Sequence, residues 1–388
     1  MNSGTMKTCR PKIAVVVPKY GLVGGAERFA AEVTSRLAAS TDYEFHVFAH
    51  QWAAPNDSPV IFHRIPRRPF PRSLRPWSFA RHVARGLKSE DFDLVHSHDR
   101  IFAADIVSLH CTPHRFWVRN VLQKRMSLFD HSTIAVEAHL LTQSRSATFL
   151  PVSSLTMDLF RREYPASAGT WKVAPPGVDY ERFSSPDREN CRRNIRERHK
   201  VPKNAFLILF AGMNFELKGL DTIMESVAMA RRQRPEAGFH LLVVGRGQIG
   251  RYLAKAGTLE VEDAVTFVGE VTNNIEEYYR GSDAFMLLSA FDTFGMVVLE
   301  AMAAGTPVIV GRNVGARDIV QHGSSGFVMD NHIDAKTAAR HLRELCHEDT
   351  ARRFGVAAAR TAAGSDWQQT TNLIAQAYEA SLHDRRRK

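Results

Sequence analysis

Short apolar runs alternate with helix-length segments twice along the chain, and no other feature of its 388 residues constrains the fold as strongly. Residues 12–18 (KIAVVVP) form a β-branched run that is typical of a strand buried within a parallel sheet. A glycine loop follows, and then the apolar side chains Phe29, Val33 and Leu37 recur at the spacing of one helix face. The chain therefore opens with a strand, a glycine loop and a helix, which is the first unit of an α/β domain.

The same alternation predicts the remaining strands. We expect strands at residues 43–49, 93–97, 105–109 and 147–152 in the first half, and at 206–211, 240–244, 264–268, 284–288 and 307–310 in the second. Between residues 171 and 204 the chain turns through Pro175-Pro176-Gly177 into a charge-dense stretch, which predicts a connection between domains. Both halves are therefore expected to be doubly wound parallel sheets.

Composition narrows the class of protein. No apolar run approaches the ~18 residues of a membrane span, and residues 1–12 are polar, so we expect a cytoplasmic protein. The cysteines are far apart, which predicts neither a zinc knuckle nor a disulfide framework; they are Cys9, Cys111, Cys191 and Cys346. A net charge of +10 indicates an anionic partner and leaves nucleic acid, anionic lipid and a phosphorylated substrate open.

Two short motifs suggest other chemistries. Residues 245–250 fit G-x-G-x-x-G, with Glu270 where a ribose-binding acid would stand, but the dinucleotide fingerprint normally opens the first unit of its fold. Here it follows the second predicted strand of the second half, so a plain strand-to-helix turn is the preferred interpretation. Asp91 and Asp93 fit a metal-binding D-x-D, although two acids before a buried strand are more often a solvated loop.

An arginine-rich run extends from residue 64 to residue 85. Seven arginines are interleaved there with Phe70, Trp77 and Phe79, a composition that can bind nucleic acid through phosphate contacts and stacking. The prolines of the run and the lack of a nucleic-acid motif favour a basic surface for a lipid or a phosphorylated sugar instead.

The strongest motif spans residues 291–309. Asp292 and Glu300 stand eight residues apart around a glycine turn, followed by a helix and a strand. The turn at residues 293–296 would offer backbone N–H groups and a positive helix end to a diphosphate or to sugar hydroxyls, and Glu300 would accept from vicinal ribose hydroxyls. The segment resembles the E-x7-E segment of the retaining family 4 glycosyltransferases, which have the GT-B fold.

The resemblance covers nearly the whole chain. Gly24-Gly25 match the glycine loop of that family, and residues 211–219, which include Lys218, match its phosphate-binding segment. Residues 265–271, ending at Val271, match the strand and loop that cradle the nucleobase, and residues 175–179 match the segment between domains. Within the family, the N-F-E-x-K-G segment is most similar to lipopolysaccharide core glucosyltransferases that act on the first heptose.

This chain departs from the family pattern at two positions. Asp292 stands where a longer glutamate is usual, which puts the identity of the donor sugar in doubt. Met213 stands where an arginine is common, so Lys218 would carry more of the diphosphate charge, with help from Arg246 or another arginine.

Histidines stand at the ends of predicted strands in the first half, where ligands bind in open α/β sheets. His110 resembles the family histidine near the reacting centre, and its role would be to position the sugar as a neutral imidazole. Asp105 is a candidate for contact with acceptor hydroxyls, and His98 is a weaker candidate. A metal site made of His96, His98 and His110 is disfavoured.

Residues 113–129 predict a basic amphipathic helix, with Trp117, Val121 and Phe129 along its apolar stripe. Such a helix suits an anionic membrane surface, while a core-facing helix with a solvated basic side fits the residues equally well. The resemblance favours the membrane, because lipid-linked acceptors of the family are met at the inner leaflet.

The resemblance implies a GT-B fold, with two doubly wound Rossmann-like domains facing a cleft. Residues 12–176 and a C-terminal helix at 367–388 would bind the acceptor, and residues 177–366 would bind the donor. The implied reaction is retaining transfer of a hexose, with glucose the expected sugar, from a UDP-sugar to a hydroxyl of a lipopolysaccharide core or another lipid-linked glycan. Closure of the cleft would exclude water.

The roles implied by the resemblance fall on few residues. The expected catalytic residues are His110, Lys218 and Asp292. The expected substrate-binding residues are Gly24, Gly25, Asp105, Lys218, Val271, Thr293, Phe294, Gly295, Met296 and Glu300. We expect no metal or other cofactor and no nucleic-acid partner, and we place the protein on the inner face of the cytoplasmic membrane. The alternatives are transfer from UDP-N-acetylhexosamine or GDP-mannose, an NAD(P) oxidoreductase, and a basic binding protein without catalysis.

Overall fold

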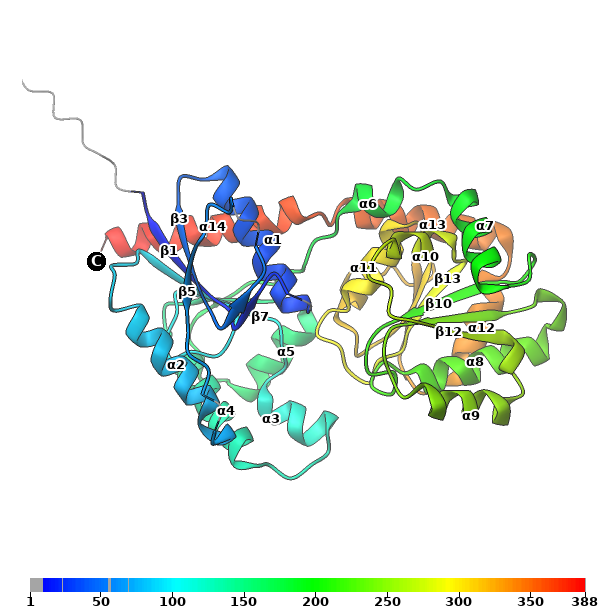
Figure 1. Cartoon of the computed structure of the whole chain (residues 1–388), viewed down its shortest axis with the longest axis horizontal. Coiled ribbons are helices and arrows are strands. Elements are labelled where there is room, and N and C mark those ends of the chain that lie inside the picture. The colour runs from blue at the N-terminus through cyan, green and yellow to red at the C-terminus, as the bar shows by residue number, and fades with distance from the viewer. Residues whose placement is uncertain (1–9, 23, 55–56, 69, 388) are drawn as a thin grey trace, which may run out of the picture. The chain divides into compact units, whose positions relative to one another are not determined.

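A computed structural model describes residues 10–22, 24–54, 57–68 and 70–387. Cys9 lies outside the described residues. The chain forms two compact units (Figure 1): Met1–Pro175 together with Trp367–Lys388, and Pro176–Asp366. The N-terminal unit thus includes the last helix of the chain.

The N-terminal unit is built on a parallel sheet of seven strands. Their order across the sheet is β5 (Ile61–Arg64), β3 (Glu44–Ala49), β1 (Lys12–Val16), β6 (Leu94–Ser97), β7 (Ile106–Leu109), β8 (Thr148–Pro151) and β9 (Thr170–Trp171). A short parallel pair, β2 (Lys19–Tyr20) and β4 (Gln51–Trp52), lies beside it. The chain builds outward from β1 to β5 and then returns to β6, so the strand order reverses between β1 and β6. Ligands bind at the carboxyl ends of strands at such a reversal.

Helices cover the sheet of the N-terminal unit (Figure 1). They include α1 (Gly25–Ser40), α2 (Arg75–Gly86), α4 (Leu128–Gln143), α5 (Ser154–Glu163) and α14 (Trp367–Arg386). Helix α1 buries Phe29, Val33 and Leu37, as its spacing predicts. Trp367 at the start of α14 meets Phe29 edge-on with ring centroids 5.7 Å apart, and Tyr378 further along α14 is buried.

The C-terminal unit is built on a parallel sheet of six strands. Their order is β12 (Val265–Gly269), β11 (His240–Val244), β10 (Leu207–Ala211), β13 (Ala284–Leu287), β14 (Val308–Gly311) and β15 (Gly326–Met329). The longer helices are α7 (Arg188–His199), α8 (Leu220–Gln233), α9 (Ile249–Leu259), α11 (Met296–Ala303), α12 (Ala335–Leu345) and α13 (Glu348–Ala363), with the short α6 (Tyr180–Ser184) and α10 (Ile275–Gly281). The strand order reverses between β10 and β13.

The predicted fold class is confirmed, since both units are parallel-sheet, Rossmann-like α/β domains. Every predicted strand is present within one or two residues of its expected bounds. The strands that the apolar pattern does not predict are the short or edge elements β5, β9 and β15, together with the β2 and β4 pair. None of the helices in the described ranges is both long and apolar enough to cross a membrane.

The prediction of one amphipathic helix at residues 113–129 is wrong. The segment begins with a single turn of helix, α3 (His114–Phe116), continues as a π-helix at Trp117–Val121, and then loses helical structure. Helix α4 begins only after Ser127, because the Ser127 side chain accepts from the Asp130 amide while the Asp130 carboxylate accepts from the Ser127 amide. This capping box starts a new helix where the apolar periodicity alone would continue the old one.

Candidate functional site

Lys218 and Asp292 form an ion pair where the strand order of the C-terminal unit reverses. The two residues follow the carboxyl ends of β10 and β13, and Lys218 Nζ lies 2.5 Å from Asp292 Oδ2. Their side chains are 23% and 14% exposed, so the pair is sheltered and still reachable from solvent. The arrangement places one cation and one carboxylate together at the ligand-binding edge of the sheet.

Close contact between two loops creates this pair. The turn after β10 closes with Asn214 in the left-handed region, and Phe215 anchors it in the core. Gly219 has a φ of +78°, and a Cβ there would lie 2.0 Å from the carbonyl oxygen of Leu288. Only glycine therefore lets the loop after β10 approach the loop after β13 and bring Lys218 to Asp292.

The expected glycine turn precedes α11. Gly295 has a φ of +86° and caps the helix, which begins at Met296. Phe294 is buried, while Thr293 and Met296 are partly exposed beside Asp292. The first N–H groups of a helix lack intrahelical partners and attract anions, so this turn is suited to a diphosphate next to Lys218.

Glu300 lies on α11, and its side chain is buried, 8% exposed. The Tyr279 hydroxyl donates to Glu300 Oε2 over 3.0 Å. This contact orients the carboxylate. Tyr279 is not among the predicted site residues. It lies 21 residues before Glu300, so no local sequence pattern indicates that the two side chains meet. Val271 lies in the loop after β12, at the same edge of the sheet.

Arg246 lies beside Met213, the position where the family pattern has an arginine. Arg246 Nη2 is 3.5 Å from the Met213 sulfur, and its Nε is paired with Glu270. The Arg246 side chain is 66% exposed, so it can leave Glu270 for another anion. A guanidinium therefore stands beside the turn that carries Lys218, supplied by the neighbouring loop.

The glycines of the G-x-G-x-x-G stretch have packing roles. A Cβ on Gly245 would lie 1.9 Å from the carbonyl oxygen of Gly212, and one on Gly247 would meet the Phe215 ring at 2.2 Å. These glycines let the loop after β11 pack on the loop after β10. Glu270 is held by Arg246. Neither feature calls for a dinucleotide.

Three histidines meet in the N-terminal unit at the carboxyl ends of β6 and β7. His98 Nδ1 lies 2.9 Å from His110 Nε2, and His96 bonds the Tyr378 hydroxyl and Ser108 Oγ. Burial lowers the pKa of His110 to about 3, so its imidazole is neutral at pH 7. The expected neutral, positioning role is compatible with this environment. The structure also brings His98 next to His110, and within the described part of the chain His98 Nε2 has no hydrogen-bond partner.

Gly24 and Gly25 lie where the glycine loop enters α1. Gly24 has a φ of +149° and caps the helix, and its carbonyl accepts from the Arg28 amide over 3.0 Å. A Cβ on Gly24 would collide with the Glu27 carboxylate, 2.1 Å away. The structure thus has a second helix N-terminus at the carboxyl edge of a sheet, close in sequence to β1.

Asp105 does not join the histidines. It precedes β7 and therefore lies at the amino end of that strand, the opposite edge of the sheet from His110. Its carboxylate accepts from the Val95 amide at 2.8 Å and from Arg385 Nη2 at 2.6 Å. Because these partners come from a neighbouring strand and from α14, the role of Asp105 is to hold α14 on the sheet. This placement argues against the predicted contact of Asp105 with an acceptor.

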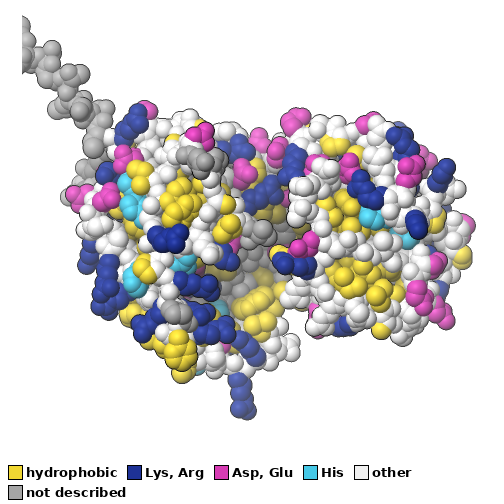
Figure 2. Space-filling model, viewed as in Figure 1, with side chains coloured by type: hydrophobic (Ala, Val, Ile, Leu, Met, Phe, Trp, Pro, Cys, Tyr) yellow, Lys and Arg dark blue, Asp and Glu magenta, His cyan; other side chains and the backbone are white. Residues whose placement is uncertain are grey.

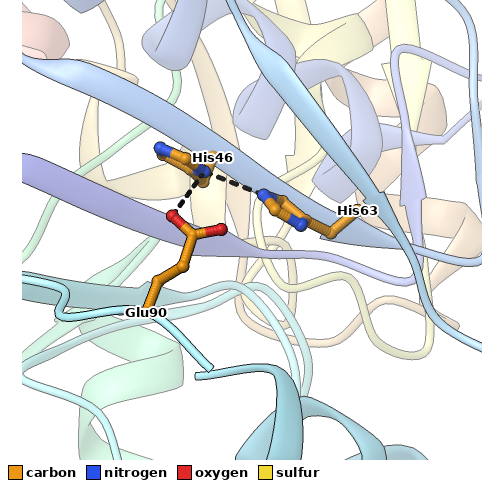
Figure 3. A group of neighbouring side chains, drawn as sticks. All are labelled: His46, His63 and Glu90. Atoms are coloured by element: carbon orange, nitrogen blue, oxygen red, sulfur yellow. Dashed lines mark hydrogen bonds and ion pairs between the residues drawn. The ribbon is translucent and has the colours of Figure 1, made fainter. Parts of the chain in front are cut away.

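His46, His63 and Glu90 form a group of possible metal ligands (Figure 3). His46 Nδ1 lies 2.8 Å from His63 Nε2, and the ring planes are inclined by 22°, with centroids 5.0 Å apart. With these distances the two nitrogens point directly at each other, as they do in an N–H···N hydrogen bond. Two nitrogens that bind one metal ion instead direct their lone pairs at a common point between them. The Lys12 ammonium already lies 3.2 Å from Glu90 Oε2. The group is better described as a hydrogen-bonded cluster than as a metal site.

Comparison with protein families gives two matches. Residues 192–361 match the family described as "Glycosyl transferases group 1", and residues 23–182 match "Glycosyltransferase Family 4". Together the matches cover most of both units, including Lys218, Asp292 and Glu300 in one and Gly24, Gly25 and His110 in the other.

Individual relatives are similar over different lengths. A D-inositol 3-phosphate glycosyltransferase of Pseudarthrobacter chlorophenolicus is 28% identical over an alignment covering 94% of this chain and 92% of the relative. The enzyme of the same name from Streptomyces scabiei is 33% identical, over 58% of this chain and 52% of the relative. That second alignment spans about half of the relative's length.

Solved structures share the fold. WaaG, a glycosyltransferase involved in lipopolysaccharide biosynthesis, matches with a TM-score of 0.77 at 20% identity, over 94% of this chain and 98% of WaaG. Anabaena HepE in complex with UDP-glucose matches with a TM-score of 0.71 at 18% identity, over 95% and 99% of the two chains. At such identity the likeness concerns the fold. The relatives named above carry D-inositol 3-phosphate in their names, so a narrower likeness to heptose glucosyltransferases has no support among them.

Proposed function

We propose that this chain, whose two halves match the group 1 and the family 4 glycosyltransferase models, moves a hexose from a UDP-sugar to a hydroxyl of a glycan or lipid-linked acceptor. The observation that carries the proposal is the Lys218–Asp292 pair at the strand reversal of the C-terminal unit, next to the N-terminus of α11. Charge develops on the leaving diphosphate during transfer, and a preorganised cation stabilises it there.

The proposed donor site lies in the C-terminal unit. Lys218, with Arg246 beside it, neutralises the diphosphate, and the turn at residues 293–296 donates backbone N–H groups to it. Glu300, oriented by Tyr279, accepts from the ribose hydroxyls. Asp292 accepts from a hydroxyl of the sugar once the diphosphate shares Lys218. The proposed donor is UDP-glucose, with UDP-N-acetylhexosamine and GDP-mannose as the alternatives.

The proposed acceptor site lies in the N-terminal unit, near His110. The acceptor oxygen bonds to the anomeric carbon as the bond from that carbon to the diphosphate breaks, and a donor phosphate oxygen takes the hydroxyl proton. Attack from the face of the departing group retains the anomeric configuration. Neutral His110 positions a sugar hydroxyl and needs no proton transfer of its own. We propose that turnover requires no metal and persists in EDTA.

Two acceptor classes are proposed. A lipopolysaccharide core glycan or another lipid-linked glycan is the first, as the family resemblance implies. D-inositol 3-phosphate is the second, since the relative aligned over 92% of its own length carries that acceptor in its name. The test is nucleotide release from a panel of nucleotide-sugars with each acceptor in turn. Release that rises with one acceptor class selects it.

We also propose that the protein binds an anionic membrane surface. The arginine-rich surface, residues 64–85, contains seven arginines and no acidic residue. Large apolar side chains are exposed within it: Phe70 is 80%, Leu74 is 42% and Trp77 is 48% exposed. Figure 2 shows dark-blue and yellow side chains gathered on this lower part of the N-terminal unit. Exposed aromatic groups among arginines suit a bilayer rich in anionic lipid.

Vesicle sedimentation tests this membrane proposal. The protein should sediment with vesicles containing about one third phosphatidylglycerol and remain in solution with pure phosphatidylcholine vesicles. Phe70→Ser should weaken partitioning by roughly tenfold, because burial of a large apolar side chain contributes about 1.5–3 kcal/mol. Leu253→Ser, which changes an exposed leucine of α9, is the matched control. Equal sedimentation of wild type and Phe70→Ser would contradict the proposal, and binding to RNA but not to vesicles would replace it.

A further inference from the structure

A cavity lies in the C-terminal unit, away from the Lys218–Asp292 pair. It has a volume of about 890 Å³ and is lined in part by Phe206 and Asp283, which directly precede β10 and β13. The cavity is therefore at the amino ends of the two strands whose carboxyl ends carry Lys218 and Asp292. Its volume is in the range of small-molecule sites.

The lining of this cavity is rich in cationic side chains. Six basic residues line it: Arg188, Arg192, Lys203, Arg234, Arg280 and Arg352. The acidic residues that line it are Glu189, Glu236, Asp283 and Glu348. Asp283 is paired with Arg192 and Arg196, and Glu236 is paired with Arg234, so these pairs use lining arginines as well as lining acids. Arg352 is paired with Asp349 on its own helix. The lining therefore carries six positive and four negative charges, an excess of two positive charges.

Arg188 and Arg280 converge within the cavity at Gly305. A Cβ on Gly305 would lie 3.2 Å from Arg280 Nη1 and 3.7 Å from Arg188 Nη1. Arg188 donates to the carbonyl oxygens of Gly305 and Ser282 at 3.0 and 3.1 Å, and Arg280 Nη1 donates to that of Ala304 at 2.8 Å. In the described chain, neither guanidinium has a carboxylate oxygen within 4.0 Å.

The two guanidiniums therefore repel one another without an anion between them. Burial lowers the pKa of Arg188; the Asp283 carboxylate raises it in part, and the neighbouring Arg280 and Arg192 lower it again. Carbonyl oxygens satisfy some donors of each group, and Arg280 Nη2 has no partner among the described residues. The two arginines also hold the carbonyls of Ala304 and Gly305, directly after the C-terminus of α11, where positive charge is favourable.

We propose that this cavity binds the phosphate group of a small phosphorylated molecule between Arg188, Arg280 and Lys203. Arginine presents its N–H donors in a planar fork that matches phosphate oxygens, and a doubly charged phosphate offsets the excess of positive charge. Lys203 is exposed at the rim. This inference goes beyond the proposed transferase function and does not depend on it, since the cavity and the Lys218 turn lie at opposite edges of the sheet.

Calorimetric titration with inorganic pyrophosphate tests the proposal. The titration uses Lys218→Ala, which removes one of the two cations of the proposed donor site. The changes at Lys203 and Arg352 then separate binding in the cavity from binding at the remaining Arg246. We expect one pyrophosphate to bind per chain at about 0.15 M salt. Adding Lys203→Glu and Arg352→Glu should weaken this binding tenfold or more, while adding Arg353→Glu should leave it unchanged. Arg352 lines the cavity and Arg353 does not, although both are exposed on α13.

The outcomes separate this proposal from the transferase function. No pyrophosphate binding to Lys218→Ala, or binding that the Lys203→Glu and Arg352→Glu changes leave intact, overturns the cavity proposal. Circular dichroism and the melting temperature establish that the variants are folded. The side chains of Lys203, Arg352 and Arg353 are exposed, so changing them should not alter the fold of Lys218→Ala. If the wild-type protein binds pyrophosphate in this way but binds no UDP, the result supports the cavity proposal and contradicts the proposed donor site.

Discussion

Lys218→Ala should lower kcat at saturating donor by about 100-fold or more, and the KM for the donor should rise as well, because the diphosphate is negatively charged both before and during transfer. Removing one preorganised donor that stabilises developing charge typically costs ~10²–10³ in kcat. The substitution also leaves the Asp292 carboxylate without its cation, 14% exposed at the place proposed for the diphosphate. An unpaired carboxylate there would repel the leaving group, so the effect should exceed the simple loss of one contact.

Steady-state kinetics with the preferred donor measure this effect, with Lys336→Ala as the matched control because Lys336 is exposed on α12 of the same unit. Arg246→Ala should cost less than Lys218→Ala, since the Arg246 side chain is 66% exposed and its interactions are screened by solvent. A Lys218→Ala enzyme that keeps kcat within a few-fold of wild type would contradict the role given to Lys218.

Glu300→Gln should weaken UDP binding by about tenfold or more without unfolding the protein. A hydrogen bond to a charged group contributes about 1.5–3 kcal/mol, and removal of the charge loses much of that. Glutamine has nearly the same volume and its side-chain oxygen still accepts from the Tyr279 hydroxyl, so α11 should keep its packing. The loss should therefore appear in nucleotide affinity and not in the melting temperature.

Calorimetric titration with UDP measures that affinity, and Glu262→Gln, a change at an exposed glutamate of the same unit, is the control. Unchanged UDP affinity in Glu300→Gln would show that the ribose is held elsewhere. A large fall in melting temperature would instead assign Glu300 a structural role through Tyr279.

The sheet strands were predictable because each is a short apolar run with a clear boundary. β10, for instance, is fully buried and is apolar throughout, and β11 is fully buried and apolar after His240. β5 is different. It is a four-residue edge strand whose residues are only partly buried, so its sequence lacks that apolar signal. The prediction of a helix at residues 113–129 was wrong for a related reason. The polar side chains of Ser127 and Asp130 determine where α4 begins, and the spacing of apolar residues contains no information about them.

The candidate site residues stand out in the sequence as motifs, whereas their contact partners do not. Lys218 and Asp292 stand 74 residues apart, and only the contact of two loops at Gly219 shows that they pair. Asp105 shows the converse. A polar residue beside a strand suggests a ligand site. Asp105, however, lies at the amino end of β7, and its partner Arg385 comes from the distant helix α14, which only the tertiary structure shows. Arg246 beside Met213 is likewise a contact between separate loops.

The measurement that tests the central claim most directly is nucleotide release from a panel of UDP- and GDP-sugars in EDTA, with and without each acceptor class. We predict release of UDP from one UDP-sugar, increased several-fold by either the glycan or the D-inositol 3-phosphate acceptor. Release from a GDP-sugar would contradict the proposed donor. No release from any donor, together with no UDP binding by calorimetry, would contradict the transferase site built on Lys218, Asp292 and Glu300.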